Sequence, residues 1–369
     1  MKADIAIVLG TRPEAIKLAP VALALAARQI PFHMISTGQH RDLIAGALLP
    51  FGLKPTHDLA LMREGQSLDE LLARLIAGLG QALAAIGPRM VVVQGDTATA
   101  LAGALAAFHA RIPCAHVEAG LRSGRLDAPW PEEGYRRMVD RIAARLYAPT
   151  PGARENLLAE GVEASRILVT GQTGVDAALW VAQRPRGAAS GLPRLGERTR
   201  VIYATAHRRE GQAALASTLA ALSRVVAERP DVEVVMPLHP NPEVRRQALP
   251  FLHAHPRLHV IEPLGYADSV HLLRRASLVV TDSGGLQEEA PSFGLPVLVT
   301  REVTERPEGI EAGFLKIVGL DSSRLHAAMI SVLDDPGLRD LLQRTPNPYG
   351  DGHAAERIAD DLAGGALSG

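Results

Sequence analysis

The segment Thr281-Asp282-Ser283-Gly284-Gly285-Leu286-Gln287-Glu288-Glu289-Ala290-Pro291 lies between two short apolar runs, residues 277–280 and 296–299. This pattern predicts a strand, a glycine-rich turn, a helix that begins at about Gly284, and a further strand. The start of a helix leaves N–H groups unpaired and carries partial positive charge, and Ser283, Gly284 and Gly285 would let an anion approach closely. A buried acid at residues 287–289 could accept ribose hydroxyls. The segment therefore predicts either a nucleotide site or an ordinary turn capped by Ser283, because its spacing is neither Walker A nor GxGxxG.

The composition is that of a globular chain of 369 residues, which is long enough for two domains. It is 47% hydrophobic, and 39 basic residues balance 40 acidic ones, so we expect no nucleic-acid partner and no disordered tail. The single cysteine, Cys114, excludes an internal disulfide framework and lies in an apolar run, where we expect it to be buried. We also expect no signal peptide, no membrane span and a cytoplasmic location, because the long apolar stretches are interrupted.

Strands and helices alternate along both halves of the chain. Predicted strands cover residues 3–9, 31–36, 90–93, 113–117, 201–204, 232–236, 258–261, 278–281 and 296–299, and the tail, residues 351–363, is predicted to be helical. Continuous apolar strands separated by helices indicate parallel sheets covered on both faces, whose ligands bind beyond the carboxyl ends of the strands. Residues 183–198 lack periodicity, which puts a domain boundary between about 170 and 198. We therefore predict two doubly wound α/β domains with a cleft between them.

Charged side chains follow the predicted strands of the first half. Arg12 lies at a helix start that attracts anions, and Lys17 lies one turn further along, as a ligand or as a solvated cation. Asp96 either caps the next helix or takes part in acid–base chemistry, and Glu118 follows a buried strand ahead of a glycine-rich loop. Glu132 either suits a helix dipole or adds a third acid. Carboxylates that share a site push their pKa values apart, so one can act as base and another as acid.

The second half places cationic side chains at its strand ends. His207-Arg208-Arg209 would suit a phosphate. Metal-ligand spacings such as CxxC and HExxH are absent from the sequence, so we predict no catalytic metal.

Eleven motifs occur in order along nearly the whole chain: GTRPEAIK, TGQH, QGDT, HVEAGLRSG, PWPEE, TGQT, HRRE, HPNP, TDSGGLQEEAP, REVTERPE and NPYGDG. This ordered set resembles the non-hydrolysing UDP-N-acetylglucosamine 2-epimerases. The resemblance implies a GT-B fold that binds a UDP-sugar between two Rossmann-like domains, residues 1–170 and 171–352, with a C-terminal helix in residues 353–369 returning to the first domain. It also implies inversion at C2 of the sugar, through elimination of UDP to 2-acetamidoglucal and re-addition, without a cofactor.

The resemblance implies roles for individual residues as well. The catalytic positions are Asp96, Glu118, Glu132 and His207. The substrate-binding positions are Arg12, Lys17, Ser283, Gly284, Gly285, Glu289 and Arg306. The positions for a second UDP-N-acetylglucosamine, bound as an activator, are Gln39, Arg41, Gln66, Glu132 and His239. The resemblance further implies a homodimer, although no interface can be located from the sequence.

The sequence departs from the family pattern at several positions. Ser269 and Leu264, near the expected uracil, stand where Phe and Gln occur, and Asp42 stands where the activator site often has Gln. The shared motifs discriminate poorly at C3 and C6 of the sugar, so a 2-epimerase of a 2,3-diacetamido uronic acid type of UDP-sugar stays open. A hydrolysing epimerase, a GT-B glycosyltransferase and a non-catalytic UDP-sugar sensor stay open too, although the three acids disfavour the glycosyltransferase.

Overall fold

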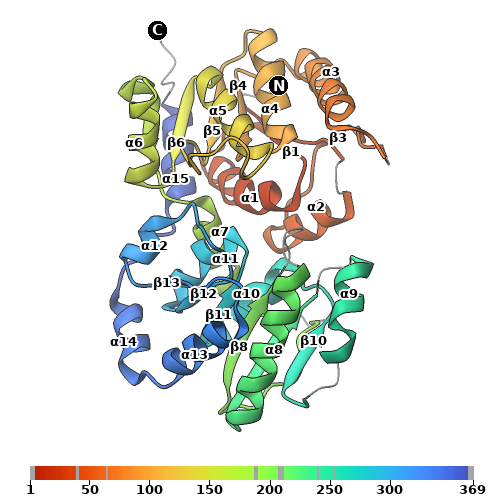
Figure 1. The fold of residues 1–369 in the computed structure, drawn as a ribbon. Coiled ribbons are helices and arrows are strands. Elements are labelled where there is room, and N and C mark those ends of the chain that lie inside the picture. The colour runs from red at the N-terminus through yellow and green to blue at the C-terminus, as the bar shows by residue number, and fades with distance from the viewer. Residues whose placement is uncertain are drawn as a thin grey trace. The chain divides into compact units, whose positions relative to one another are not determined.

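The computed structural model describes residues 5–38, 41–63, 65–186, 190–206, 212–238, 241–251 and 255–364, without the side chains of residues 41, 42, 212–214, 242, 243 and 247. Contacts divide the chain into two compact units (Figure 1). The N-terminal unit contains residues 1–180 and 349–369, and the C-terminal unit contains residues 181–348.

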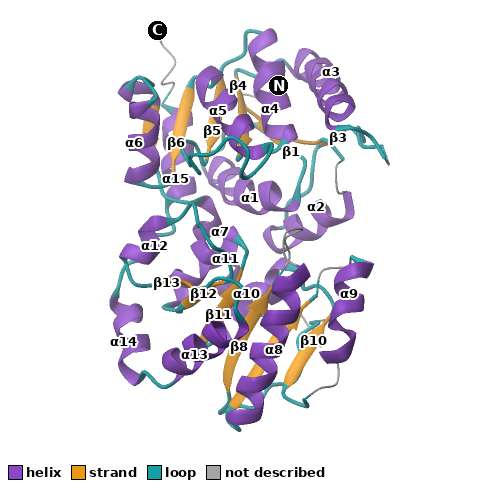
Figure 2. Ribbon diagram, in the orientation of Figure 1, coloured by secondary structure: helices purple, strands orange, loops and turns teal. Residues whose placement is uncertain are grey.

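The N-terminal unit is built on a seven-stranded parallel sheet with the order β3-β2-β1-β4-β5-β6-β7. Figure 2 shows strands of this sheet in orange and the surrounding helices in purple. Its strands are β1 (Ile5–Leu9), β2 (Phe32–Ser36), β3 (His57–Asp58), β4 (Met90–Gln94), β5 (Cys114–Val117), β6 (Arg145–Ala148) and β7 (Ile167–Val169). Its helices are α1 (Arg12–Ala27), α2 (Arg41–Leu48), α3 (Leu68–Ile86), α4 (Ala98–His109), α5 (Glu132–Ile142), α6 (Pro151–Ala159), α7 (Thr173–Ala182) and α15 (Ala354–Ala363), of which α7 runs to the unit boundary.

Helices cover the sheet of the N-terminal unit because its strands are apolar on both sides. Every residue of β1 is buried, and Ala6 and Val8 pack against Leu75 of α3 and Leu101 of α4. The last helix, α15, lies in this unit and contacts α1. Its first turn is held by Asp176 of α7, whose carboxylate accepts a hydrogen bond of 2.7 Å from the backbone N–H of Ala355.

The C-terminal unit contains a six-stranded parallel sheet with the order β10-β9-β8-β11-β12-β13. Its strands are β8 (Arg200–Thr205), β9 (Val232–Pro237), β10 (Leu258–Ile261), β11 (Leu278–Thr281), β12 (Val297–Val299) and β13 (Leu315–Ile317). Its helices are α8 (Gln212–Glu228), α9 (Pro242–Ala248), α10 (Tyr266–Arg275), α11 (Gly284–Glu289), α12 (Pro307–Glu311), α13 (Ser322–Leu333) and α14 (Pro336–Arg344). Successive residues of β8 enter two different apolar clusters, so this sheet too is covered on both faces.

Both sheets have the strand order of a Rossmann fold, in which the chain starts in the middle, builds one side and then returns to build the other. The prediction of two doubly wound parallel α/β sheets is therefore confirmed, as is a helix that begins at Gly284. The sequence prediction missed four strands, β3, β6, β7 and β13. They contain two to four residues each, and β3 (His57–Asp58) contains no apolar residue at all.

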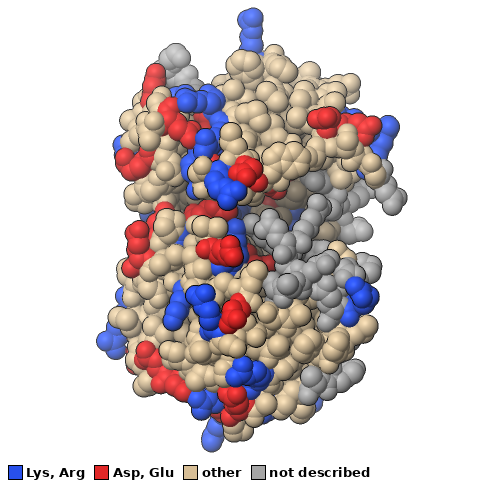
Figure 3. Space-filling model, in the orientation of Figure 1, with Lys and Arg blue, Asp and Glu red and all other residues tan. Residues whose placement is uncertain are grey.

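Two expectations from composition can be compared with the structure. Cys114 is buried as expected, and its burial raises the pKa of the thiol to about 12. Among the described helices, none is both long enough and apolar enough to cross a membrane. On the face drawn in Figure 3, acidic and basic side chains of the described residues are interspersed, in keeping with a formal net charge of −1.

Candidate active site

In the N-terminal unit, the strands that precede the predicted acids are neighbours. The order β1-β4-β5 places the turns after Leu9, Gln94 and Val117 side by side at the carboxyl edge of the sheet. There the Oε2 atom of Glu118 accepts hydrogen bonds from Lys17 Nζ and from Gln94 Nε2, the latter at 2.8 Å. Lys17 is only 8% exposed, so the prediction of a solvated cation is wrong. The structure thus joins a predicted substrate-binding cation to a predicted catalytic acid.

The backbone at Glu118 has an unusual conformation. Its φ angle is +70°, in the left-handed region that a residue with a Cβ atom rarely adopts. The N–H groups of Glu118 and Ala119 both donate to the Tyr147 carbonyl at 3.1 Å, which holds the turn to strand β6. Such a conformation costs of order 1–3 kcal/mol and persists where the surrounding structure imposes it, often at functional sites.

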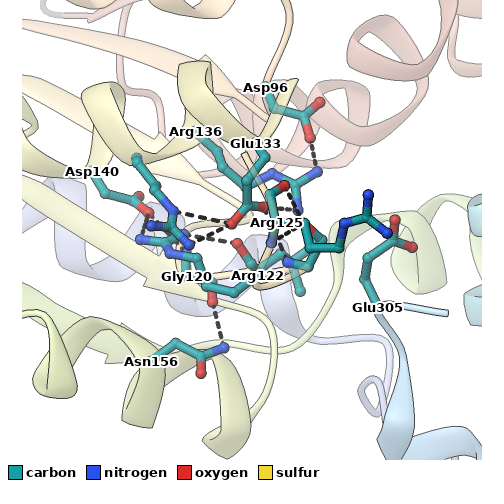
Figure 4. Close-up of polar contacts among 12 residues, drawn as sticks. Asp96, Gly120, Arg122, Arg125, Glu133, Arg136, Asp140, Asn156 and Glu305 are labelled. Carbon is teal, nitrogen blue, oxygen red and sulfur yellow. Dashed lines mark hydrogen bonds and ion pairs between the residues drawn. The ribbon is translucent and has the colours of Figure 1, made fainter. Parts of the chain in front are cut away.

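Asp96 does not cap the helix that follows it. Thr97 is the cap of α4, and its Oγ1 atom accepts a hydrogen bond of 3.1 Å from Ala100 N–H. The Asp96 carboxylate instead forms an ion pair with Arg136 of α5 (Figure 4). The prediction of Asp96 as a helix cap is therefore wrong, because the next residue has the extended backbone and the side chain that a cap requires.

The two adjacent acids of the PWPEE motif have different surroundings. Glu133 is completely buried, and its carboxylate accepts from Ser123 N–H at 3.0 Å and pairs with Arg137 at 2.9 Å. Glu132, the first residue of α5, is half-buried, and no hydrogen bond or ion pair joins it to another described residue. Glu133 thus secures the loop before α5, whereas the Glu132 carboxylate remains available to a ligand.

Glu14 occupies a position that the sequence prediction missed. Its carboxylate accepts hydrogen bonds from Gly10 N–H at 2.9 Å, from Thr11 N–H at 2.6 Å and from Thr97 Oγ1 at 2.6 Å. Burial raises the pKa of Glu14, against the lowering effect of these hydrogen bonds. The anion position at the start of α1 is thus taken by a side chain of the protein, which leaves Arg12 as the ligand-binding candidate there. The spacing Thr11-x-x-Glu14 is a capping box and could have revealed this.

In the C-terminal unit, the turn before α11 contacts a cation. Ser283 is the N-cap residue of α11, as the alternative of an ordinary turn predicted, but its side chain makes no capping hydrogen bond. The Arg306 guanidinium lies against Gly284 so closely that a Cβ atom there would be 2.5 Å from Nη2. Arg306 also pairs with Glu288 at 2.6 Å and with Glu305. A glycine-rich helix start and a guanidinium therefore meet at one place, as an anion site requires.

The acids and the predicted uracil neighbours of this unit are mostly buried. Glu289 is 7% exposed, and its Oε1 atom accepts a hydrogen bond of 3.3 Å from the Tyr266 hydroxyl. Ser269 forms a hydrogen bond of 2.8 Å with the Tyr203 hydroxyl, and Leu264 packs in the apolar core. Burial works against ionisation of Glu305, but Arg301 and Arg306 lower its pKa to about 2. The predicted ribose acceptor thus lies on the same short helix as the Arg306 contact.

Several predicted positions lie outside the described residues. These are His207, Gln39 and His239, while the side chain of Arg41 is not described either. Gln66 is described, and it accepts a hydrogen bond of 3.2 Å from Arg63 N–H. The activator site therefore stays a prediction. Within the described ranges, no group of three or more His, Cys, Asp or Glu side chains could hold a metal ion.

The chain is a doubly wound α/β protein of two Rossmann-like units. One unit has cation-paired acids at its strand ends, and the other has a glycine-rich helix start beside an arginine. Residues 23–363 match the family model described as UDP-N-acetylglucosamine 2-epimerase. The chain belongs to that family.

Relatives and solved structures are similar over nearly the full length. A probable UDP-N-acetylglucosamine 2-epimerase from Ralstonia nicotianae is 44% identical, with 95% of this chain and 96% of the relative covered. The UDP-N-acetylglucosamine 2-epimerase of Escherichia coli K12 is 41% identical, with 98% of each chain covered. The crystal structure of the Neisseria meningitidis enzyme bound to UDP-GlcNAc has a TM-score of 0.92 at 36% identity, covering 98% of this chain and 99% of that one. These similarities confirm the predicted family and its GT-B fold class.

Proposed function

We propose that this protein interconverts UDP-N-acetylglucosamine and UDP-N-acetylmannosamine. A base removes the C2 proton while the C1–O bond breaks, so UDP leaves with the bonding electrons and 2-acetamidoglucal remains. UDP then adds back to C1, and an acid delivers a proton to the opposite face of C2. The proposal is supported by membership of the family and by its relatives' names.

The observation that carries the proposal is the pairing of two acids with cations at neighbouring strand ends. Lys17 lies beside Glu118 and Arg136 lies beside Asp96, and a positioned carboxylate can accept a proton in acid–base catalysis. Glu132, the first residue of α5, forms no ion pair with another described residue. We propose these three acids, with His207, as the catalytic residues.

The departing UDP needs fixed positive charge. We propose that Ser283, Gly284 and Gly285 donate backbone N–H groups to the diphosphate, that Arg306 adds its guanidinium, and that Glu289 accepts the ribose hydroxyls. Support comes from the contact of Arg306 with Gly284 and from the burial of Glu289. We propose that Arg12 and Lys17 bind the diphosphate and sugar from the N-terminal unit.

Nuclear magnetic resonance in deuterated water tests this function. The protein should introduce deuterium at C2 of UDP-N-acetylglucosamine and produce a mixture of the gluco and manno sugars. Absence of exchange, with or without added nucleotide, would overturn the proposal. Accumulation of free UDP would identify a hydrolysing enzyme, and exchange only with a 2,3-diacetamido uronic acid derivative would identify a different substrate.

We also propose the finer properties that the resemblance implies. A second UDP-N-acetylglucosamine would act as an activator at Gln39, Arg41, Gln66, Glu132 and His239. Sigmoidal kinetics that disappear in His239→Ala would support this site, and hyperbolic kinetics of the unaltered protein would contradict it. We propose a cytoplasmic homodimer, which light scattering and cell fractionation can test.

A further inference from the structure

A completely buried ion pair lies behind the turn that carries Glu118. The ring of His116, on β5, has Nδ1 2.7 Å from Asp140 Oδ1 and Nε2 2.8 Å from the carbonyl oxygen of Gly95. A carboxylate and a carbonyl oxygen can only accept hydrogen bonds, so both ring nitrogens must donate. His116 is therefore a doubly protonated imidazolium, and Asp140 is its counter-ion.

The same carboxylate also holds the other end of the turn. Its Oδ2 atom accepts from Gly120 N–H at 3.3 Å and pairs with Arg122 at 2.8 Å (Figure 4). The Gly120 carbonyl accepts a hydrogen bond of 3.0 Å from Asn156 of α6. Asp140 thus contacts residues 116 and 120, which lie two positions before and two positions after Glu118.

These contacts of Asp140 support the backbone conformation at Glu118. Gly120 lies against helix α6 so closely that a Cβ atom at that position would be 2.2 Å from the Ala153 carbonyl oxygen. A left-handed residue in the middle of a turn persists when both of its ends are fixed. Asp140 therefore contacts both ends of the turn that contains Glu118, at φ +70°, in addition to the hydrogen bonds that hold this turn to the Tyr147 carbonyl.

The His116–Asp140 pair also contacts the backbone next to Asp96. The Gly95 carbonyl that His116 binds belongs to the residue immediately before Asp96. On the same helix as Asp140, Arg136 holds the Asp96 carboxylate. One buried imidazolium–carboxylate pair consequently contacts the backbone beside both acids at the ends of β4 and β5.

We propose that His116 and Asp140 are positioning residues for Glu118 and Asp96, an inference that rests on the proposed function. Both side chains are fully buried, so they do not reach a substrate and act through the two turns. A shift of about 1 Å in a catalytic acid can lower the reaction rate on the order of 100-fold. Residues that fix the positions of two such acids therefore affect turnover more than affinity.

The charge state of His116 can be measured without any substrate. In protein labelled with ¹⁵N at histidine, we expect the His116 ring to carry protons on both nitrogens at neutral pH. In Asp140→Asn, the Nδ1 proton should be lost. A neutral His116 ring in the unaltered protein would overturn the inference, whatever the enzyme's activity.

The kinetic test compares Asp140→Asn with a matched control. Asparagine preserves the side-chain volume, but its single oxygen cannot accept hydrogen bonds from His116, Gly120 N–H and Arg122 together. We therefore expect kcat for C2 exchange to fall about 10- to 100-fold, while KM changes less than about threefold. The control is Glu160→Gln, which removes a different carboxylate from Arg122 and leaves the contacts to residues 116 and 120 intact. Its kcat should stay within about twofold of the unaltered value.

The outcomes separate this inference from the proposed function. If the unaltered protein does not exchange C2, the proposed function is wrong, and the histidine spectrum still tests the ion pair. If it does exchange C2 and Asp140→Asn has unchanged kcat, the positioning role is wrong. If Asp140→Asn does not fold, Asn156→Ala releases only the Gly120 carbonyl, and kcat should fall several-fold at constant KM. An unchanged kcat in that variant would overturn the inference.

Discussion

The Lys17 ammonium group donates a hydrogen bond to the Glu118 carboxylate across 101 positions of sequence, and each side chain is 10% exposed. The pair joins helix α1 to the turn after strand β5. Because both charges are largely removed from water, each depends on the other for compensation.

Lys17→Met should destabilise the protein by about 3 kcal/mol, because it leaves the Glu118 carboxylate buried without its cation. Urea unfolding measures the loss. The double variant Lys17→Met with Glu118→Gln should be less destabilised than the single variant, since no charge is then left unpaired. Equal destabilisation of the two would show that the pair contributes no electrostatic coupling.

Asp96→Asn should lower kcat for C2 exchange by about 100-fold or more, because an amide cannot accept the proton that a carboxylate accepts. Affinity for UDP, measured by calorimetry, should hardly change, since Asp96 is not among the residues proposed to bind the diphosphate. Asp127→Asn is a suitable control, because this acid is 72% exposed and pairs with the exposed Arg125. Full activity of Asp96→Asn would remove Asp96 from the catalytic residues.

Gly284→Ala should weaken UDP binding about tenfold or more. The added methyl group would lie 2.5 Å from the Arg306 guanidinium and would push this flexible side chain away from the turn. Gly337→Ala, at the start of α14 in the same unit, has no neighbour closer than 3.6 Å and should bind UDP normally. Unchanged affinity in Gly284→Ala would argue against the anion site.

Asp176 should make stability depend on pH. Burial, as the largest cause, raises its pKa from 3.8 to about 6, so the folded state retains a proton that the unfolded state has already lost. Stability should therefore decrease as pH rises between about 4 and about 6, by roughly 3 kcal/mol in total. Asp176→Asn cannot ionise, so its stability should lack this decrease while its amide oxygen still accepts from Ala355 N–H. Parallel pH dependences of the two proteins would contradict the prediction.

The sequence by itself determined most of the elements and their types. Apolar runs located nine of the thirteen described strands, and the glycine-rich turn marked Gly284 as the first residue of α11. These signals are local, because hydrogen bonds and apolar periodicity within one segment decide whether it forms a helix or a strand. The ordered motifs also determined the family, which the comparisons confirm.

Only the tertiary structure decided which of those elements are neighbours. The approach of Lys17 to Glu118 follows from α1 and β5 meeting at one edge of the sheet, and that of Arg136 to Asp96 from α5 lying beside the turn after β4. No local pattern specifies such pairs, because strand order and loop closure bring together residues that are 40 or 101 positions apart. The same reason explains why Asp96 resembled a helix cap in sequence, although its carboxylate is held by a helix that begins 36 residues later at Glu132.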